Sequence, residues 1–249
     1  RVNRAVIDQM DRLVHTSTLY PTEPIVRLAE KLASIAPGKL RKSFFVASGT
    51  EADETAVMLA QVFTNRTEVI ALRHGYSGRS MLGQALTAHA HYRAIPTQVA
   101  AIKHAPSPYC YRCPLRLDPA SCHTACARDL SELIATTTTG RIAGMLVEPI
   151  QGVGGFITPP RDYLAIASEI VRRHGGVMII DEVQTGFGRT GTMWGCQQFG
   201  VDPDIMTMAK GIANGLPLGA VTCTTEIADA LTAGSISTFG GNPVCATAA

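Results

Sequence analysis

The chain has 249 residues, 46% of them hydrophobic and 17% charged, which is enough apolar surface for a large core and excludes a disordered segment. Its net charge is +2, and no cluster of Lys or Arg marks a surface for nucleic acid or for a membrane. No run approaches the roughly 20 apolar residues that span a bilayer. We therefore expect an α/β protein with one large domain, or with a large domain and part of a second.

The two ends of the sequence indicate a piece of a longer protein. Arg1 is not an initiating Met, no apolar signal region follows it, and an amphipathic helical pattern begins at once. The last residues, 242–249, have the composition of the first turns of a helix. Any targeting sequence would then lie outside this chain. Seven scattered Cys residues favour reduced thiols, so we expect a cytoplasmic protein, with the mitochondrial matrix as the alternative.

Short apolar runs alternate with helical patterns along the sequence, which is typical of a parallel sheet covered by helices on both faces. The helical patterns include residues 51–63, 128–136 and 162–174. The apolar runs predict about seven strands in one sheet, at residues 44–46, 69–72, 100–102, 145–147, 177–180, 205–208 and 219–222. In such sheets ligands bind at the carboxyl ends of the strands, and polar residues follow the strands here.

The first of these polar segments is Ala47-Ser48-Gly49-Thr50-Glu51, between a strand and a helix. A helix N-terminus carries unpaired N–H groups and a partial positive charge, and a Gly lets an anion approach the backbone closely. Gly49 and Thr50 are therefore candidates for binding a phosphate. An ordinary Ser/Thr cap on a strand-to-helix turn is the alternative.

Four Cys residues cluster in a Pro-rich segment, as Cys110-x2-Cys113-x8-Cys122-x3-Cys126. Two closely spaced ligand pairs could complete the tetrahedral site of a structural zinc. We favour an irregular loop with incidental thiols, so no metal is expected.

Asp181 follows the run Val177–Ile180, which predicts a strand buried on both faces. A carboxylate at the end of such a strand is poorly solvated and needs a cationic partner or strong hydrogen-bond donors. A protonated pyridine nitrogen would be such a partner. An Asp that caps a helix is the alternative.

Lys210 is one of only five Lys residues, and it directly follows the buried run Ile205–Ala209. A lysine in that place is uncommon unless it is paired or used in chemistry. We expect partial burial to favour an uncharged, nucleophilic amine that can form a Schiff base. A lysine that extends to the surface is the alternative.

Five segments in this order resemble the class III, fold-type-I aminotransferases, which bind pyridoxal 5'-phosphate (PLP). They are residues 48–56, Glu148-Pro149-Ile150-Gln151-Gly152, residues 181–189, Ala209-Lys210-Gly211 and residues 238–243. The resemblance implies a fold-type-I large domain, with a mainly parallel seven-stranded sheet between helices. It also implies an N-terminal helical segment over residues 1–40, a truncated PLP-binding large domain over 41–249, and a small domain that is largely missing.

The resemblance implies cofactor contacts at eight positions of this sequence. Lys210 would form the Schiff base and then move a proton between substrate and cofactor, and Asp181 would pair with the pyridine nitrogen. The others would bind the phosphate (Gly49, Thr50), stack on the ring (Tyr76), pack behind it (Val183), lie near the phenolic oxygen (Gln184) or reach the phosphate of the neighbouring subunit (Thr238). The last contact implies a homodimer with shared active sites.

The resemblance also implies the substrates, an amino acid and a 2-oxo acid. Arg79 would receive a substrate carboxylate as a bidentate fork, and Glu148 and Tyr20 would lie in the substrate site. Many family members have a Glu where this sequence has Val153, and that Glu masks a carboxylate-binding Arg in the C-terminal part. Without it, we expect the alanine–glyoxylate aminotransferase 2 or ω-amino-acid–pyruvate branch, with pyruvate or glyoxylate as acceptor.

Two other functions are compatible with the same residues. Relatives of this branch act as lyases on phosphorylated amino alcohols, and others as aminomutases or racemases; a lyase would need no 2-oxo acid. The second alternative is a truncated protein that folds but does not catalyse.

Overall fold

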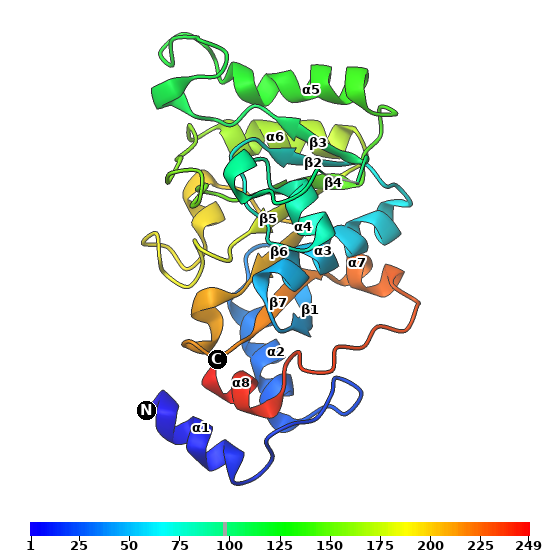
Figure 1. Cartoon of the computed structure of the whole chain (residues 1–249), viewed down its shortest axis with the longest axis vertical. Coiled ribbons are helices and arrows are strands. Elements are labelled where there is room, and N and C mark those ends of the chain that lie inside the picture. Colours follow the sequence, from blue (N-terminus) through cyan, green and yellow to red (C-terminus); the bar gives the residue numbers. More distant parts are fainter. Residues whose placement is uncertain (97–98) are drawn as a thin grey trace.

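The computed structural model describes residues 1–96 and 99–249. Seven strands form one sheet in the order β1-β7-β6-β5-β4-β2-β3 (Figure 1). They are β1 (Leu40–Val46), β2 (Val69–Leu72), β3 (Ile102–Ala105), β4 (Gly144–Val147), β5 (Val177–Asp181), β6 (Ile205–Met208) and β7 (Gly219–Thr224). Strand β7 is antiparallel to both its neighbours, β1 and β6, whereas β6, β5, β4, β2 and β3 are parallel. The prediction of a mainly parallel, seven-stranded sheet is confirmed.

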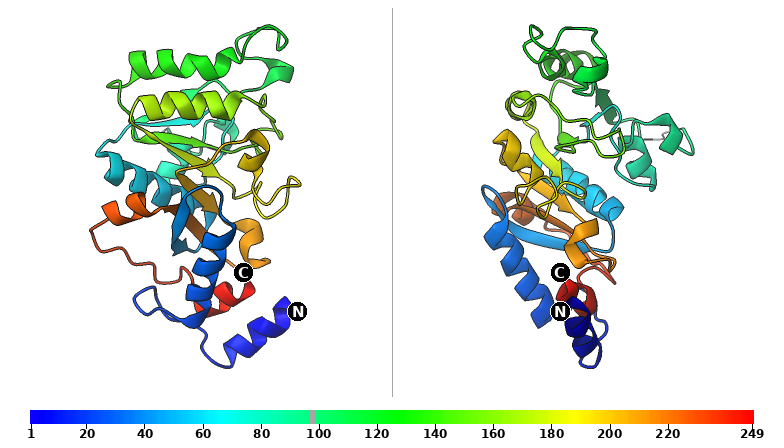
Figure 2. Two further views of the ribbon diagram at one scale, coloured as in Figure 1. Left: turned by 180° about the vertical axis from the view of Figure 1, so that it is seen from behind. Right: turned by 90° about the vertical axis from the view of Figure 1, so that its left-hand side faces the viewer.

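Helices cover both faces of this sheet (Figure 2). One face carries α2 (Glu23–Ile35), α5 (Ala125–Thr137), α6 (Tyr163–Arg173) and α8 (Pro243–Ala248). The other carries α3 (Gly49–Thr64), α4 (Met81–Leu86) and α7 (Thr225–Ala230). The remaining helices are α1 (Val2–Met10) and the short 3-10 helices η1 (Ala90–Tyr92), η2 (Cys110–Arg112), η3 (Gly195–Phe199) and η4 (Lys210–Ala213). Within the described residues, no helix has the length and apolar character needed to cross a membrane.

Side chains along the central strands alternate between two apolar clusters, one on each face of the sheet. Ile180 of β5 packs into the cluster formed with α5 and α6, whereas Val177 and Ile179 pack into the cluster under α3. The same alternation directs Asp181, the last residue of β5, toward α3. Its partner across the ladder in β6, Thr207, points the same way. Two polar side chains therefore face α3 at the carboxyl end of the sheet.

Strand β3 differs from its predicted position. The apolar run at residues 100–102 predicts a strand there, but β3 runs from Ile102 to Ala105. It contains Lys103 and His104, and it is an edge strand that pairs only with β2. Edge strands tolerate polar side chains because one side faces solvent, so apolar patterning located this strand poorly.

Candidate active site

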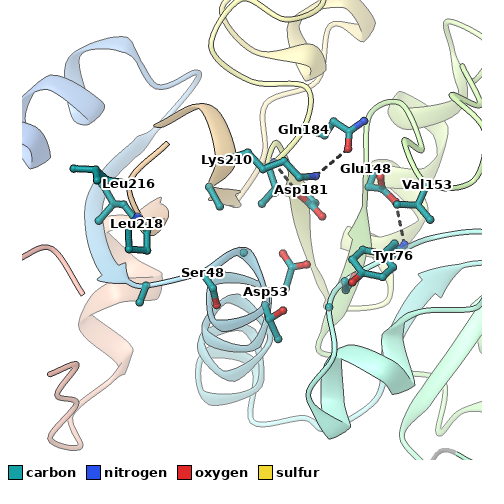
Figure 3. Close-up of a pocket in the computed structure, with 18 residues that line it drawn as sticks. Ser48, Asp53, Tyr76, Glu148, Val153, Asp181, Gln184, Lys210, Leu216 and Leu218 are labelled. Carbon is teal, nitrogen blue, oxygen red and sulfur yellow. Dashed lines mark hydrogen bonds between the residues drawn. The ribbon is translucent and has the colours of Figure 1, made fainter. Parts of the chain in front are cut away.

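The N-terminus of α3 forms one end of a cavity of about 320 Å³ (Figure 3). Ser48 caps the helix, because its Oγ accepts a hydrogen bond from the N–H of Glu51 at 3.2 Å. The N–H groups of Gly49 and Thr50 have no acceptor in the described part of the chain, and both residues line the cavity. Free N–H groups at a helix N-terminus attract anions, so this end of the cavity suits a phosphate.

Two glycines keep the phosphate end of the cavity open. A Cβ on Gly49 would lie 3.3 Å from a methyl carbon of Val183, which packs against it. A Cβ on Gly78 would come within 2.1 Å of the Thr50 hydroxyl, and Gly78 has a φ of +116° that other residues rarely adopt. A side chain at Gly78 would therefore displace Thr50.

Asp181, the last residue of β5, also lines this cavity and is only 5% exposed. Its Oδ1 accepts a hydrogen bond from the N–H of Val183 at 2.8 Å. Burial raises the pKa of Asp181 to about 6, while the Val183 N–H and the charge of Lys210 favour the ionised form. The prediction that this carboxylate is poorly solvated is confirmed, and no Lys or Arg of the described residues forms an ion pair with it.

Glu148 brings a second carboxyl group to the cavity, from the segment that follows β4. Its Oε1 accepts from the N–H of Tyr76 at 3.1 Å and its Oε2 from the N–H of Gly152 at 2.9 Å. Burial and then the charge of Asp181 raise the pKa of Glu148 to about 7. The two N–H bonds fix the carboxyl group and, through Tyr76, the loop that carries this tyrosine.

Lys210 opens η4 directly after β6, with a φ of +46°. The left-handed region costs a residue other than Gly roughly 1–3 kcal/mol, and such strained residues cluster at functional sites. The Lys210 amine donates to Gln184 Oε1 at 2.9 Å, above Asp181 (Figure 3). The expectation of partial burial is wrong for the single chain: the side chain is exposed, because the turn at Lys210 directs it into the open cavity.

Tyr76, Val153 and Val183 line the cavity between its two ends. The Tyr76 ring packs edge-on against Tyr92, with 5.5 Å between the ring centroids. Tyr76 and Val153 lie beside Glu148 (Figure 3).

Three residues with predicted roles lie elsewhere. Arg79, Tyr20 and Thr238 are exposed, and none of them lines this cavity. The roles of all three stay predictions.

Sequence reasoning missed Asp53, which lines the same cavity and is 2% exposed. It lies on the buried face of α3, with Ala52, Ala56 and Val57. An acidic residue in an apolar helical stripe was the signal that could have identified it.

The four clustered Cys residues surround one small pocket beside η2 and α5. Burial raises the pKa of Cys126 to about 11. In the described ranges, 1–96 and 99–249, no group of three or more His, Cys, Asp or Glu side chains is placed to hold a metal ion. The structure gives no support to the zinc alternative.

The cavity as a whole suits a flat molecule that carries a phosphate and a cationic ring. Asp53, Glu148 and Asp181 contribute three carboxyl groups, and Lys210 is the one cationic side chain among the described residues that line it. A cationic ligand atom near Asp181 would balance this excess of acid, and the free N–H groups of α3 would bind a phosphate. PLP fits both requirements.

Comparisons with known proteins agree with the site. The family model described as aminotransferase class-III matches residues 1–249. The mitochondrial alanine–glyoxylate aminotransferase 2 homolog 2 of Arabidopsis thaliana is 45% identical, over 98% of this chain and 50% of its own length. Acetylornithine aminotransferase of Mycobacterium leprae is 40% identical, over 100% of this chain and 57% of its own.

A solved structure shows the same fold. The amine transaminase from an uncultivated Pseudomonas species, in its PLP-bound form, superposes with a TM-score of 0.92 at 34% identity, over 99% of this chain and 60% of that chain. The chain spans about half the length of the curated relatives named above. It belongs to the class III aminotransferases, a family of PLP-dependent enzymes.

Proposed function

We propose that the full-length protein is a PLP-dependent transaminase, which transfers an amino group from alanine or an ω-amino acid to pyruvate or glyoxylate. The observation that carries the proposal is the meeting of Lys210, Asp181 and the free N-terminus of α3 around one cavity. In a chain of this family, that arrangement supports roles for Lys210 as the nucleophilic amine, for Asp181 as the partner of a ring nitrogen and for the N-terminus of α3 as the phosphate site.

PLP supplies, when bound, a carbonyl carbon that condenses with amines and a ring that withdraws electrons. Gly49 and Thr50 would bind its phosphate through their free N–H groups. Asp181 would hold a proton on the ring nitrogen by an ion pair, and the Val183 N–H orients this carboxylate. Tyr76 and Val183 would pack against the two sides of the ring.

Lys210 would hold the cofactor through its amine and, once released by the substrate amine, carry a proton between two carbon atoms. Gln184 Oε1 accepts a hydrogen bond from this amine, and we propose that Gln184 also lies near the phenolic oxygen of the ring. A neutral amide orients the amine through a hydrogen bond rather than an ion pair.

We base the choice of substrates on Val153 and Arg79. Val153 lines the cavity next to Glu148 and presents no charge, so it cannot mask a carboxylate-binding Arg. Arg79, with Tyr20 and Glu148, would contact the substrate. The name of the plant relative, which pairs alanine with glyoxylate, supports this choice.

We propose a homodimer in which Thr238 reaches the phosphate of the neighbouring subunit. The segment around Thr238 is exposed and carries two exposed apolar side chains. Ile236 is 63% exposed, and Phe239 is 62% exposed and contacts His15. In a homodimer, the second copy would shield these apolar side chains from solvent. Sedimentation of the full-length protein as a monomer would contradict this.

Two further predictions stay proposals. We assign PLP binding to residues 41–249, with residues 1–40 as a helical segment that leads into this domain. We place the protein in the cytoplasm or the mitochondrial matrix; two relatives have names that include mitochondrial. Subcellular fractionation would test the compartment.

The experiment is a panel of amino donors, each tested against pyruvate, glyoxylate and 2-oxoglutarate with the full-length protein. Alanine, β-alanine, a γ-amino acid, glutamate and N-acetylornithine serve as donors, the last because one relative is named for it. We expect alanine or an ω-amino acid with pyruvate or glyoxylate to react fastest. Clearly faster turnover with 2-oxoglutarate would refute the choice of acceptor, and ammonia release without any acceptor would indicate a lyase.

A further inference from the structure

Asp53 is an acidic side chain in a place that otherwise holds apolar residues. It lies on the face of α3 that packs on the sheet, between Ala52 and the pair Ala56 and Val57, which are fully buried. A carboxylate buried to this extent is costly unless it is paired with a cation, strongly hydrogen-bonded or protonated.

Among the described residues, no cation pairs with Asp53. In the described part of the chain no ion pair includes it, and the charged groups that act on it are two other acids, Asp181 and Glu148. Its hydrogen-bond partner among these residues is a hydroxyl group: Thr207 Oγ1 donates to Asp53 Oδ1 at 2.8 Å. A hydroxyl group is uncharged, so this bonding does not balance the negative charge of an ionised Asp53.

Asp53 and Asp181 face one another across the space between α3 and the end of β5 (Figure 3). Thr207 lies opposite Asp181 in the ladder, and both side chains point toward Asp53. Both carboxyl groups are buried and line the same cavity. Two carboxyl groups that face one another in a buried site share a proton, because two like charges are costly there.

We propose that Asp53 keeps a proton at neutral pH and donates it in a hydrogen bond to Asp181, so that the pair's single negative charge stays on Asp181. Asp53 is then a positioning residue for the proposed cofactor site, and that part of the inference rests on the proposed function. Its effect is to orient the Asp181 carboxylate from α3, while the N–H of Val183 orients it from the loop that follows β5.

The surroundings decide which of the two carboxyls carries the charge. Burial, and then the charge of Asp181, raise the pKa of Asp53 well above its usual range. Burial and the charge of Glu182 also raise the pKa of Asp181, but the Val183 N–H, which donates to Asp181 Oδ1, and the nearby charge of Lys210 favour its ionised form. The proton therefore stays on Asp53 and the charge on Asp181.

The test compares Asp53→Asn, which keeps an N–H donor toward Asp181, with Asp53→Ala, which removes it. Infrared spectra of the full-length protein at pH 8, with and without PLP, show whether a buried carboxylic acid is present, through its C=O band and the shift of that band in D2O. At pH 8 Glu148, with a pKa of about 7, is mostly ionised, so Glu148→Gln is the matched control that should leave the band in place.

We expect the band in the wild type and in Glu148→Gln, and its loss in both Asp53 variants. Asp53→Ala should also bind PLP roughly tenfold or more weakly, since a hydrogen bond to a charged group is lost, and shift the pH midpoint of the bound cofactor's absorption. Asp53→Asn should restore both toward the wild-type values. A wild type without the band, or with a band that survives in Asp53→Asn, would overturn the proposal.

The infrared experiment on the protein without PLP does not depend on the proposed function. A protein that shows the Asp53 band but binds no PLP would refute the proposed function and leave the shared proton standing. If Asp53→Ala does not fold, the wild-type band and Asp53→Asn still decide the question.

Discussion

Asp181 and Glu182 are adjacent acidic residues, both buried, yet they lie in contrasting surroundings. Glu182 receives three hydrogen bonds from the chain itself: from Thr185 Oγ1 at 2.5 Å and the Gly195 N–H at 2.9 Å on Oε2, and from the Cys196 N–H at 2.8 Å on Oε1. Asp181 receives one N–H bond and otherwise faces a cavity and a second acid.

The difference separates a buried carboxylate whose hydrogen bonds all come from the chain from one that still borders a cavity where a ligand could bind. Glu182 accepts hydrogen bonds from the loop between Thr185 and Cys196, so it holds this loop against the end of β5. Asp181 has fewer donors to offset its desolvation, and burial raises its pKa to about 6. We infer that the missing compensation comes from a bound cation. The following predictions test this contrast.

The largest effect is expected for Lys210→Ala. Removing the amine removes both the covalent hold on the cofactor and the proton carrier, which contributes roughly 10²- to 10⁴-fold to the rate. Steady-state kinetics of the full-length protein with the best substrate pair would measure it. Lys103→Ala, which changes a lysine outside the cavity, is the control and should retain wild-type turnover; equal losses in both variants would contradict the assignment.

Asp181→Asn should lower kcat by roughly 10²- to 10³-fold, the range seen when one electrostatic stabiliser is removed. Its fold should persist, because an amide relieves the repulsion with the neighbouring carboxyl groups. Kinetics and thermal unfolding would be measured on the same samples. Near-normal turnover would mean that Asp181 is only a structural residue, like Glu182.

Glu182→Gln should show the opposite pattern. The amide N–H groups of the new Gln would face hydrogen-bond donors that now bond to the Glu182 carboxylate. This clash of donors should lower the free energy of unfolding by roughly 1–3 kcal/mol. We expect a Tm several degrees below wild type and, at a temperature where the variant is folded, kcat within a few-fold of wild type. A variant with normal Tm and a large loss of kcat would remove the contrast between the two acids.

The smallest effect concerns the pH dependence of stability. The pKa of Glu148 is raised in the folded state to about 7, above its unfolded value. The folded protein therefore binds more protons than the unfolded one between about pH 4.5 and 7, so Glu148 lowers stability as pH rises through this window. Urea unfolding of the protein without PLP should show this decline, on the order of 1 kcal/mol after screening, and Glu148→Gln should show less of it. An unchanged slope would exclude Glu148 as its source.

Much of the fold and part of the candidate site could be predicted from the sequence. Apolar runs locate the central strands well, because these strands are buried on both faces, and the residues that follow them lie at one edge of the sheet. The N-terminus of α3, Asp181 and Lys210 were predicted for that reason, and the structure brings all three to one cavity.

The parts that escaped prediction depend on tertiary contacts. Nothing in the spacing of residues shows that Lys210 adopts a positive φ and an exposed side chain, or that Glu182 is held by Gly195 and Cys196. Asp53 was missed because polar residues near a helix start are usually solvated, and only the packing of α3 on β5 and β6 buries it.

The most direct measurement is borohydride reduction of the full-length protein with PLP, followed by peptide mapping. Reduction fixes the cofactor to the amine that holds it. The label is expected on Lys210, the one lysine among the described residues that line the cavity. A label on Lys31, Lys39, Lys42 or Lys103, or no label after demonstrated PLP binding, would contradict the account.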